Sequence, residues 1–323
     1  MTRDDTQSWD NYWQGRNAEK GHDALVGVGI ENNSTLQRFW NDALSAHSRD
    51  IPIVDLACGA GSVLRTANAL GFVDMTGVDI ADNALQLLTS RIPAAKAVRS
   101  PLHDIALETA SAGFVVSQYG LEYAHDRRAE AFGEIARILR PGGSCILVMH
   151  IVDGAIHREC QTSRRNADTV LDSGFIEAAD GVLDTIERSD AGEKALLAER
   201  MQRLNTSAGT LANWLGSVDQ GTNDFARFTM YLLNGTKRLI INHDAHVIAE
   251  SRAWLRGMRA EVEAYRGRMT SMLDAALGRE ELDRIMARIG HGDDAALTFN
   301  PPETLSFADG APPAAWVIKA RKP

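Results

Sequence analysis

The chain has 323 residues, of which 44% are hydrophobic, so it can form one large domain or two ordinary ones around sizeable cores. Its formal net charge of -9 at pH 7 argues against a broad attraction to nucleic acid or to an anionic membrane. No stretch reaches the about 18 apolar residues of a membrane span, and the N-terminus has no basic and apolar leader. Cys58, Cys145 and Cys160 have neither metal-site nor disulfide spacing, so we expect a cytoplasmic protein without a metal.

The first predicted element is an aromatic helix. Trp9, Tyr12 and Trp13 are spaced so that their side chains share one helical face. Such a face either docks on the core or closes as a lid over a bound ligand, and the sequence leaves both interpretations open. A second helix is predicted over residues 36–46.

A glycine loop is the most informative local pattern. Residues 51–61 contain an apolar run, then Asp55, and then Gly59 and Gly61 with one residue between them. This pattern predicts a buried parallel strand that turns tightly towards a ligand at the N-terminus of the next helix, residues 62–70. A dinucleotide fingerprint needs a small residue where Leu64 stands, and a P-loop needs Gly-Lys-Ser/Thr, so neither motif is predicted.

The next elements alternate between short strands and helices. A strand over residues 75–78 ends at Asp79 and Ile80, where an acid suits hydrogen bonding to a ribose diol. Asp82 and Asn83 are predicted to cap a helix over residues 84–91.

Two further strands are predicted after that helix. A strand over residues 96–99 leads to His103 and Asp104, and a strand over residues 114–117 opens into residues 118–123. A helix and the turn Arg140-Pro141-Gly142-Gly143 then precede a strand over residues 145–149.

In this order, the elements resemble the class I S-adenosylmethionine (SAM)-dependent methyltransferases over about residues 50–150 and the last ten residues. Asp55, Ala57, Gly59 and Gly61 match the first motif of that family, with Ala57 in place of a commoner glycine, and the turn at 140–143 is highly typical of it. The resemblance implies an α/β fold with a Rossmann-like seven-stranded sheet, and SAM as cofactor with S-adenosylhomocysteine as its product. It nominates as cofactor-binding residues Tyr12, Trp13, Asp55, Ala57, Cys58, Gly59, Gly61, Asp79, Ile80, His103, Asp104, Ile105, Ser117, Gln118 and Tyr119.

The chain beyond His150 is longer than this family needs, since a minimal domain would require about 60 further residues. The recognisable end is a strand over residues 315–321, with residues 296–299 as its antiparallel partner. Helices are predicted between these parts at residues 164–172, 193–204, 208–218, 223–241, 245–277 and 279–289. We therefore predict a SAM-binding domain made of residues 1–153 plus 294–323, and a helical insertion over 154–293 that covers the acceptor or forms a dimer.

The longest predicted helix, residues 245–277, keeps one face apolar along its whole length. It must therefore pack on other inserted helices or on a second copy of the chain in a homodimer. Five arginines lie along it: Arg252, Arg256, Arg259, Arg266 and Arg268. They indicate either a solvated face paired with Glu250, Glu261 and Glu263, or an anion-binding wall that faces an acidic substrate.

His243, Asp244 and His246 precede this helix. Two histidines without a third ligand are a weak metal signal, and Asp244 is better explained as the N-cap of the helix.

Methyl transfer from SAM requires above all that the enzyme positions the nucleophile and excludes water. A hydroxyl or an acidic carbon as acceptor also requires a base. The resemblance places the acceptor beyond the fourth and fifth strands, which nominates Gln118, Tyr119, Glu122, His125, His150 and His157. Of these, His150, Tyr119 and His125 are the predicted catalytic residues, although His150 can equally be a structural histidine that bonds a loop carbonyl.

The function predicted from these residues is in-line methyl transfer from SAM to a small molecule, such as a secondary metabolite. The alternatives are a protein, carrier-bound or RNA substrate docked by the insertion, and a SAM-binding interaction protein without turnover. No Asn/Asp-Pro-Pro-Tyr sequence follows the fourth strand, which argues against amino-methylation of nucleic-acid bases. The sequence leaves open whether O, N, C or S is methylated.

Overall fold

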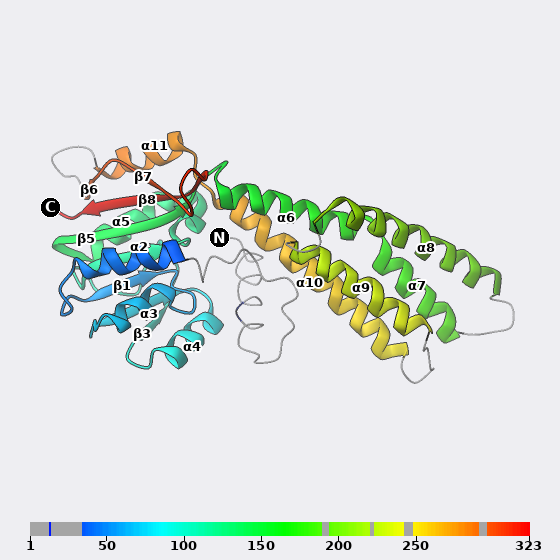
Figure 1. The fold of residues 1–323 in the computed structure, drawn as a ribbon. Coiled ribbons are helices and arrows are strands. Elements are labelled where there is room, and N and C mark those ends of the chain that lie inside the picture. The colour runs from blue at the N-terminus through cyan, green and yellow to red at the C-terminus, as the bar shows by residue number, and fades with distance from the viewer. Residues whose placement is uncertain (1–12, 14–33, 189–193, 220–222, 242–247, 291–295) are drawn as a thin grey trace. The chain divides into compact units, whose positions relative to one another are not determined.

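A computed structural model describes residue 13 and residues 34–188, 194–219, 223–241, 248–290 and 296–323 (Figure 1). The chain divides into two compact units. The first contains the described residues up to Cys160 and those from Ser271 onwards, and the second contains residues 161–270. Each unit is described by itself below.

The first unit is built around one mixed sheet. Its strands are β1 (Ile53–Leu56), β2 (Met75–Asp79), β3 (Lys96–Arg99), β4 (Ala112–Gln118), β5 (Leu139–His150), β6 (Thr298–Phe299), β7 (Glu303–Ser306) and β8 (Pro313–Arg321). The strand order is β3-β2-β1-β4-β5-β8-β6, with β7 also paired to β8. The strands β1 to β5 are parallel and β8 is antiparallel to β5. The predicted Rossmann-like α/β class is confirmed, with eight strands rather than seven because the short strands β6 and β7 both pair with β8.

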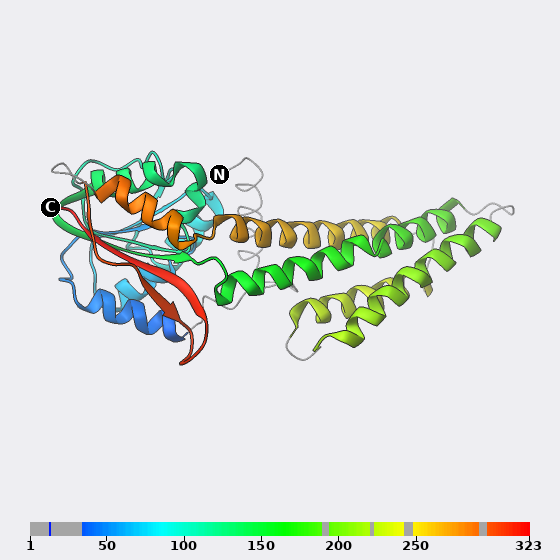
Figure 2. The ribbon, with the colours of Figure 1, turned by 90° about the horizontal axis from the view of Figure 1, so that it is seen from above.

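Helices cover both faces of this sheet (Figures 1 and 2). The helices of the first unit are α2 (Ser34–Ser45), α3 (Ser62–Ala69), α4 (Asp82–Arg91), the 3₁₀ helix η2 (Leu121–Arg127), α5 (Arg128–Ile138) and α11 (Arg279–Gly290). Apolar residues of α2, α3 and α4 form one buried cluster with the sheet, and those of α5 and α11 form another. The sheet is therefore the middle layer of three.

The strand order reverses beside β1, which pairs with β2 on one side and with β4 on the other. In open α/β sheets, ligands bind outside the carboxyl ends of the strands at such a reversal. The glycine loop follows β1 at this edge, so the fold places the loop where a ligand is expected.

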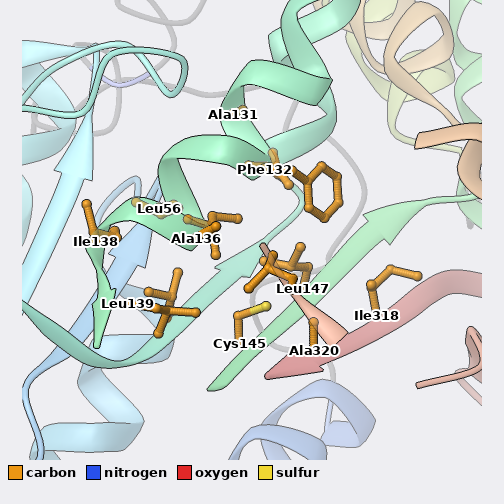
Figure 3. Packing of buried hydrophobic residues seen from close by; sticks show 14 of the residues in the cluster. Leu56, Ala131, Phe132, Ala136, Ile138, Leu139, Cys145, Leu147, Ile318 and Ala320 are labelled. Carbon is orange, nitrogen blue, oxygen red and sulfur yellow. The ribbon is translucent and has the colours of Figure 1, made fainter. Parts of the chain in front are cut away.

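Phe132 belongs to the core cluster between α5 and the sheet (Figure 3). Its side chain is fully buried, and its ring meets that of Phe299 edge-on at a centroid distance of 5.8 Å. We expect Phe132→Ala to lower the free energy of unfolding by about 3–5 kcal/mol, because the lost ring leaves a cavity in a packed core. Chemical denaturation measures this loss, with the exposed Val73→Ala as control, and a loss below about 1 kcal/mol would contradict the packing described here.

One predicted cap is wrong. The helix expected over residues 84–91 begins two residues earlier, at Asp82, and its N-cap residue is Ala81, without a side-chain cap. Asp82 lies in the first turn, where a carboxylate suits the helix dipole, and forms an ion pair with Arg99 at 3.3 Å.

The second unit is helical. It contains α7 (Phe175–Arg188), α8 (Lys194–Ser217) and α9 (Asp224–Ile241), together with most of α6 (Ala155–Asp172) and of α10 (Ile248–Ala275). The helix α7 was not predicted, and α8 is one helix where two were expected. The gap predicted between residues 204 and 208 does not occur, and the hydroxyls of Thr206 and Thr210 donate to carbonyls one turn earlier within the continuous helix.

Three of the five arginines along α10 form ion pairs with acids within the second unit. Arg252 forms ion pairs with three acids of α7, namely Asp180, Asp184 and Glu187. Arg259 pairs with Glu177 and Glu263, and Arg266 lies 3.7 Å from Asp168 of α6. Since these partners run backwards along the chain as α10 advances, α10 is antiparallel to α6 and α7. The same pairing leaves Arg252, Arg259 and Arg266 poorly suited to an anion-binding wall, and most of the partners are not the glutamates of α10 that the sequence suggested.

Within the described residues, no helix is both long enough and apolar enough to cross a membrane. A homodimer through residues 245–277 and a cytoplasmic location stay predictions.

Candidate active site

The glycine loop turns sharply after β1. Gly59 and Gly61 have positive φ angles of 52° and 79°, and Ala57 also has a positive φ of 52° although it carries a Cβ. A Cβ added at Gly59 would lie 2.6 Å from Cζ2 of Trp13, so the loop backbone and this indole are in close contact. A Cβ at Gly61 would instead meet Leu88 of α4 at 2.4 Å. The two glycines thus have different tasks, since Gly59 lets Trp13 approach and Gly61 lets the loop pack on α4.

Asp79 holds the loop from the end of β2. Its Oδ2 accepts a hydrogen bond from the Gly59 N–H at 2.9 Å, and its Oδ1 accepts one from the Ala81 N–H at 2.9 Å. Burial raises the pKa of Asp79, while the N–H groups of Ala81 and Gly59 act in the opposite direction by stabilising the charged form. The carboxylate is therefore fixed in orientation at the edge of the cavity described next.

A cavity opens at the carboxyl ends of β1, β2 and β4. Its lining residues are Trp13, Ala57, Gly59, Asp79, Ile80, Ser100, Pro101, Leu102, His103, Tyr119, Gly120, Tyr123 and Ala124. Seven of the predicted cofactor residues are in this set, from Trp13 at the N-terminal end to Tyr119 after β4. Ser100, Pro101 and Leu102 were not predicted, but they follow β3 directly, so the rule that ligands sit at carboxyl ends of strands could have found them.

Other predicted cofactor residues lie beside the cavity rather than on its wall. Ser117 is fully buried and donates to the Leu56 carbonyl at 2.8 Å, which ties β4 to β1. Cys58 is buried and its N–H donates to the Val78 carbonyl at 3.0 Å. The side-chain oxygen of Gln118 accepts from the Trp40 indole at 2.5 Å.

The three predicted cofactor residues that follow β3 also differ in whether they line the cavity. His103 lines the cavity, Asp104 is exposed, and Ile105 is buried in the core with its N–H donating to Glu134 at 2.7 Å. Tyr12 lies outside the described residues, as do His243, Asp244 and His246. The part of the chain that is described contains no group of three or more His, Cys, Asp or Glu residues able to hold a metal ion.

Asp55 is buried beneath the loop, and its Oδ2 has no hydrogen-bond partner among the described residues. Burial, and next the nearby charge of Asp79, raise its pKa well above the usual value. A carboxyl whose pKa is raised in the folded state binds its proton more tightly there than in the unfolded chain. Its ionisation therefore costs stability progressively as the pH rises from about 4 to the folded pKa.

We expect Asp55→Asn to raise the free energy of unfolding at pH 7 by about 1–2 kcal/mol, because it removes a buried carboxyl whose Oδ2 has no hydrogen-bond partner among the described residues. The gain is expected to shrink as the pH falls towards 4, where the wild-type carboxyl is protonated in both states. Denaturation curves at several pH values test this, with the exposed Asp74→Asn as control. A variant less stable than the wild type at pH 7 would show that Asp55 has a partner we have not identified.

A second group of polar side chains lies next to this cavity. Glu122 of η2 and His150 at the end of β5 are both almost completely buried. The Oε1 atom of Glu122 accepts a hydrogen bond from the His150 backbone N–H at 2.8 Å and lies 2.6 Å from Nδ1 of the His150 ring. The short contact with Oε1 favours the tautomer whose proton is on Nδ1, which leaves the lone pair on Nε2. In the described residues, neither His150 Nε2 nor Glu122 Oε2 has a partner.

Tyr119 connects this Glu122–His150 dyad to the cavity. Its ring lines the cavity and lies 4.5 Å from the His150 ring, between centroids. Its φ angle is 54°, and its hydroxyl is buried without a partner in the described part of the chain. Burial raises the pKa of Tyr119, so its hydroxyl stays a neutral donor.

The other two histidines nominated for the acceptor site, His125 and His157, are not part of the dyad. His125 has a φ angle of 49° inside η2, and its ring meets that of Tyr123 edge-on at 6.3 Å. It does not line the cavity. His157 of α6 lies 3.9 Å from Asp153, and burial lowers its pKa.

Residues 54–147 match the family model described as "Methyltransferase domain". A demethylmenaquinone methyltransferase of Leptospira interrogans is 32% identical over 127 residues, which cover 35% of this chain and 50% of that protein. The chain thus spans about half the length of this curated relative. The first unit therefore contains a class I SAM-dependent methyltransferase domain, as the motifs indicated.

Solved structures are similar over parts of the chain. A SAM-dependent methyltransferase from Mesorhizobium loti is 27% identical with a TM-score of 0.31, over 34% of this chain and 53% of that one. A geranyl diphosphate methyltransferase in complex with SAM is 19% identical with a TM-score of 0.33, over 36% of this chain and 48% of that one.

Proposed function

We propose that this protein transfers a methyl group from SAM to a small-molecule acceptor, and that His150 removes the acceptor proton. The observation that carries this proposal is the position of Tyr119. This residue lines the cavity at the glycine loop and lies on the ring of the buried His150. Tyr119 is thus both part of the wall of the proposed cofactor cavity and a neighbour of the proposed base.

The residues at the cavity fit SAM. Asp79 is an oriented carboxylate at the end of β2, which suits the two hydroxyls of a ribose. Ile80 and His103 line the same cavity and can flank an adenine. The unpartnered oxygen of Asp55 suits a cationic donor such as the ammonium of the methionine part. Trp13 offers an aromatic face at the loop, which favours a sulfonium once water is excluded.

SAM supplies a methyl group bound to a positively charged sulfur, and displacement leaves a neutral thioether. The protein then has to hold the acceptor in line, exclude water and accept a proton where the acceptor carries one. Glu122 fixes the ring of His150 so that Nε2 is the basic atom. Tyr119, whose hydroxyl has no partner within the described part of the chain, can donate that hydroxyl to the acceptor. This arrangement favours an acceptor with a dissociable proton, such as a hydroxyl.

A small acceptor is supported by the burial of the dyad, which leaves no exposed base for a macromolecular surface. The name of the Leptospira relative, a demethylmenaquinone methyltransferase, is consistent with this size class. The alternative of an acidic macromolecule docked on α10 loses its main support, because Arg252, Arg259 and Arg266 are already paired with acids.

Labelled transfer tests the proposal. The protein is incubated with methyl-labelled SAM and a metabolite extract, and the small-molecule, protein and RNA fractions are separated afterwards. We expect label in the small-molecule fraction with the wild type and a strongly reduced amount with His150→Gln. Label in the protein or RNA fraction, or none in any fraction although SAM binds, would contradict the proposed acceptor class.

A further inference from the structure

Arg128 is a buried arginine beside the dyad that none of the roles described so far requires. It is the first residue of α5, and only 8% of it is exposed. Its Nε donates to the backbone carbonyl of Glu122 at 2.9 Å, and its Nη1 donates to Glu281 Oε1 at 2.6 Å. Its Nη2 donates to the carbonyl of Ala275 at 3.0 Å, with the carbonyl of Asp274 at 3.5 Å.

The two carbonyls bound by Nη2 belong to the last turn of α10. The final carbonyls of a helix have no partner inside the helix, and a cation there is favoured by the helix dipole. The arginine therefore fastens the end of α10 to η2, the element that carries Glu122.

The chain that leaves α10 is also fastened to the other member of the dyad. The Leu277 N–H donates to the His150 carbonyl at 3.0 Å, and the Val152 N–H donates to the Leu277 carbonyl at 3.2 Å. The Trp316 indole adds a third bond, to the Leu277 carbonyl at 2.8 Å. Residues 274–277 thus contact Glu122 through Arg128 and contact His150 directly.

We propose that Arg128 is a positioning residue for the base, acting through the backbone of Glu122 and the end of α10. Among the described residues, the carboxylate of Glu122 has hydrogen bonds to His150 alone, so its place depends on the backbone of η2. Arg128 holds that backbone against the segment that also holds His150. Misplacement of a catalytic group by about 1 Å can cost about 100-fold in rate.

Arg128→Lys tests this proposal, because a lysine keeps the charge but cannot bind the Glu122 carbonyl, Glu281 and the helix end together. The first readout is the NMR signal of the His150 Nδ1 proton, which a short bond to a carboxylate makes strongly deshielded. We expect this signal in the wild type and its loss or broadening in Arg128→Lys. This readout needs neither SAM nor the acceptor, so it decides the proposal even if the proposed function is wrong.

Turnover and SAM affinity give the second readout, which rests on the proposed function. We expect kcat to fall by about 10- to 100-fold while the Kd for SAM stays within about threefold, since Arg128 is not at the cavity. Arg49→Lys is the matched control, because Arg49 likewise binds carbonyls at a helix end, those of Leu44 and His47. It is expected to keep both the signal and the rate.

An unchanged Nδ1 signal in Arg128→Lys would overturn the proposal, whatever the effect on kcat. If that variant does not fold, Glu281→Ala is used, since it leaves Arg128 in place but removes one of its anchors. The same changes are expected there at smaller size, and their absence would likewise overturn the proposal.

Discussion

His150→Gln is expected to reduce kcat by about 10²- to 10⁴-fold, which is the usual contribution of a positioned general base. Glutamine keeps a polar group of similar length but has no nitrogen that can accept a proton. The Kd for SAM is expected to stay within about threefold, because His150 is not on the wall of the cavity that we assign to the cofactor. Steady-state kinetics with an acceptor found in the labelled screen measure kcat.

Two further variants sharpen this prediction. Glu122→Gln keeps an acceptor oxygen for the His150 backbone N–H but loses the charge beside Nδ1, so we expect a loss in kcat of the same order. His47→Gln is the control, since His47 stacks on Phe114 at 3.9 Å, away from the dyad. If His150→Gln keeps more than a tenth of the wild-type kcat, the histidine is structural and the base lies elsewhere.

Asp79→Asn is expected to weaken SAM binding by about 10- to 100-fold. The Asp79 carboxylate accepts from two backbone N–H groups, and an asparagine offers one acceptor oxygen and places an NH₂ against the other N–H. It also removes the charge that a ribose diol would donate to, and hydrogen bonds to a charged group contribute about 1.5–3 kcal/mol. Equilibrium dialysis with labelled SAM measures the affinity.

Asp82→Asn is the matched control for this change. Asp82 lies three residues further along the same edge, but its side chain is exposed and paired with Arg99. We expect its SAM affinity to match that of the wild type, because an exposed ion pair contributes little. Equal affinities for Asp79→Asn and the wild type would remove Asp79 from the cofactor site.

Much of the sheet and of the cofactor edge could be predicted from local patterns. The apolar runs that end at Asp55, at Asp79 and at Gln118 each became a parallel strand, because a strand buried on both faces leaves a continuous apolar run in the sequence. The position of Asp79 after an apolar run predicts an acid at the end of β2, and the glycine at position 59 predicts a backbone that tolerates a positive φ angle. Each of these features depends on a few neighbouring residues, so a local sequence pattern is enough to predict it.

The dyad and its support could be predicted only in part. Glu122 and His150 were both nominated for the acceptor site, but their contact joins two elements 28 positions apart and no local pattern records it. Arg128 and Ala275 are separated by 147 positions, with the whole second unit between them. Arg128 reads as an ordinary surface charge at the start of a helix, and only the fold shows that it is buried.

For the long helices of the second unit, local patterns gave an incorrect boundary. The sequence predicted two helices, over residues 193–204 and 208–218, where the structure has the single helix α8. In α8 the Thr206 hydroxyl bonds back to the Gln202 carbonyl and the helix continues. The arginines of α10 could be predicted either as a solvated face or as an anion-binding wall. In the structure, Arg252, Arg259 and Arg266 pair with acids of α6 and α7, and no local pattern records these pairs.

A crystal structure of the protein with S-adenosylhomocysteine bound would test the proposed site most directly. We predict that the ligand fills the cavity between Trp13 and Tyr119, with its ribose hydroxyls on Asp79 and its sulfur beside Tyr119, whose ring packs on that of His150. A ligand bound elsewhere, or one that fills the cavity but makes no contact with Asp79, would contradict this assignment.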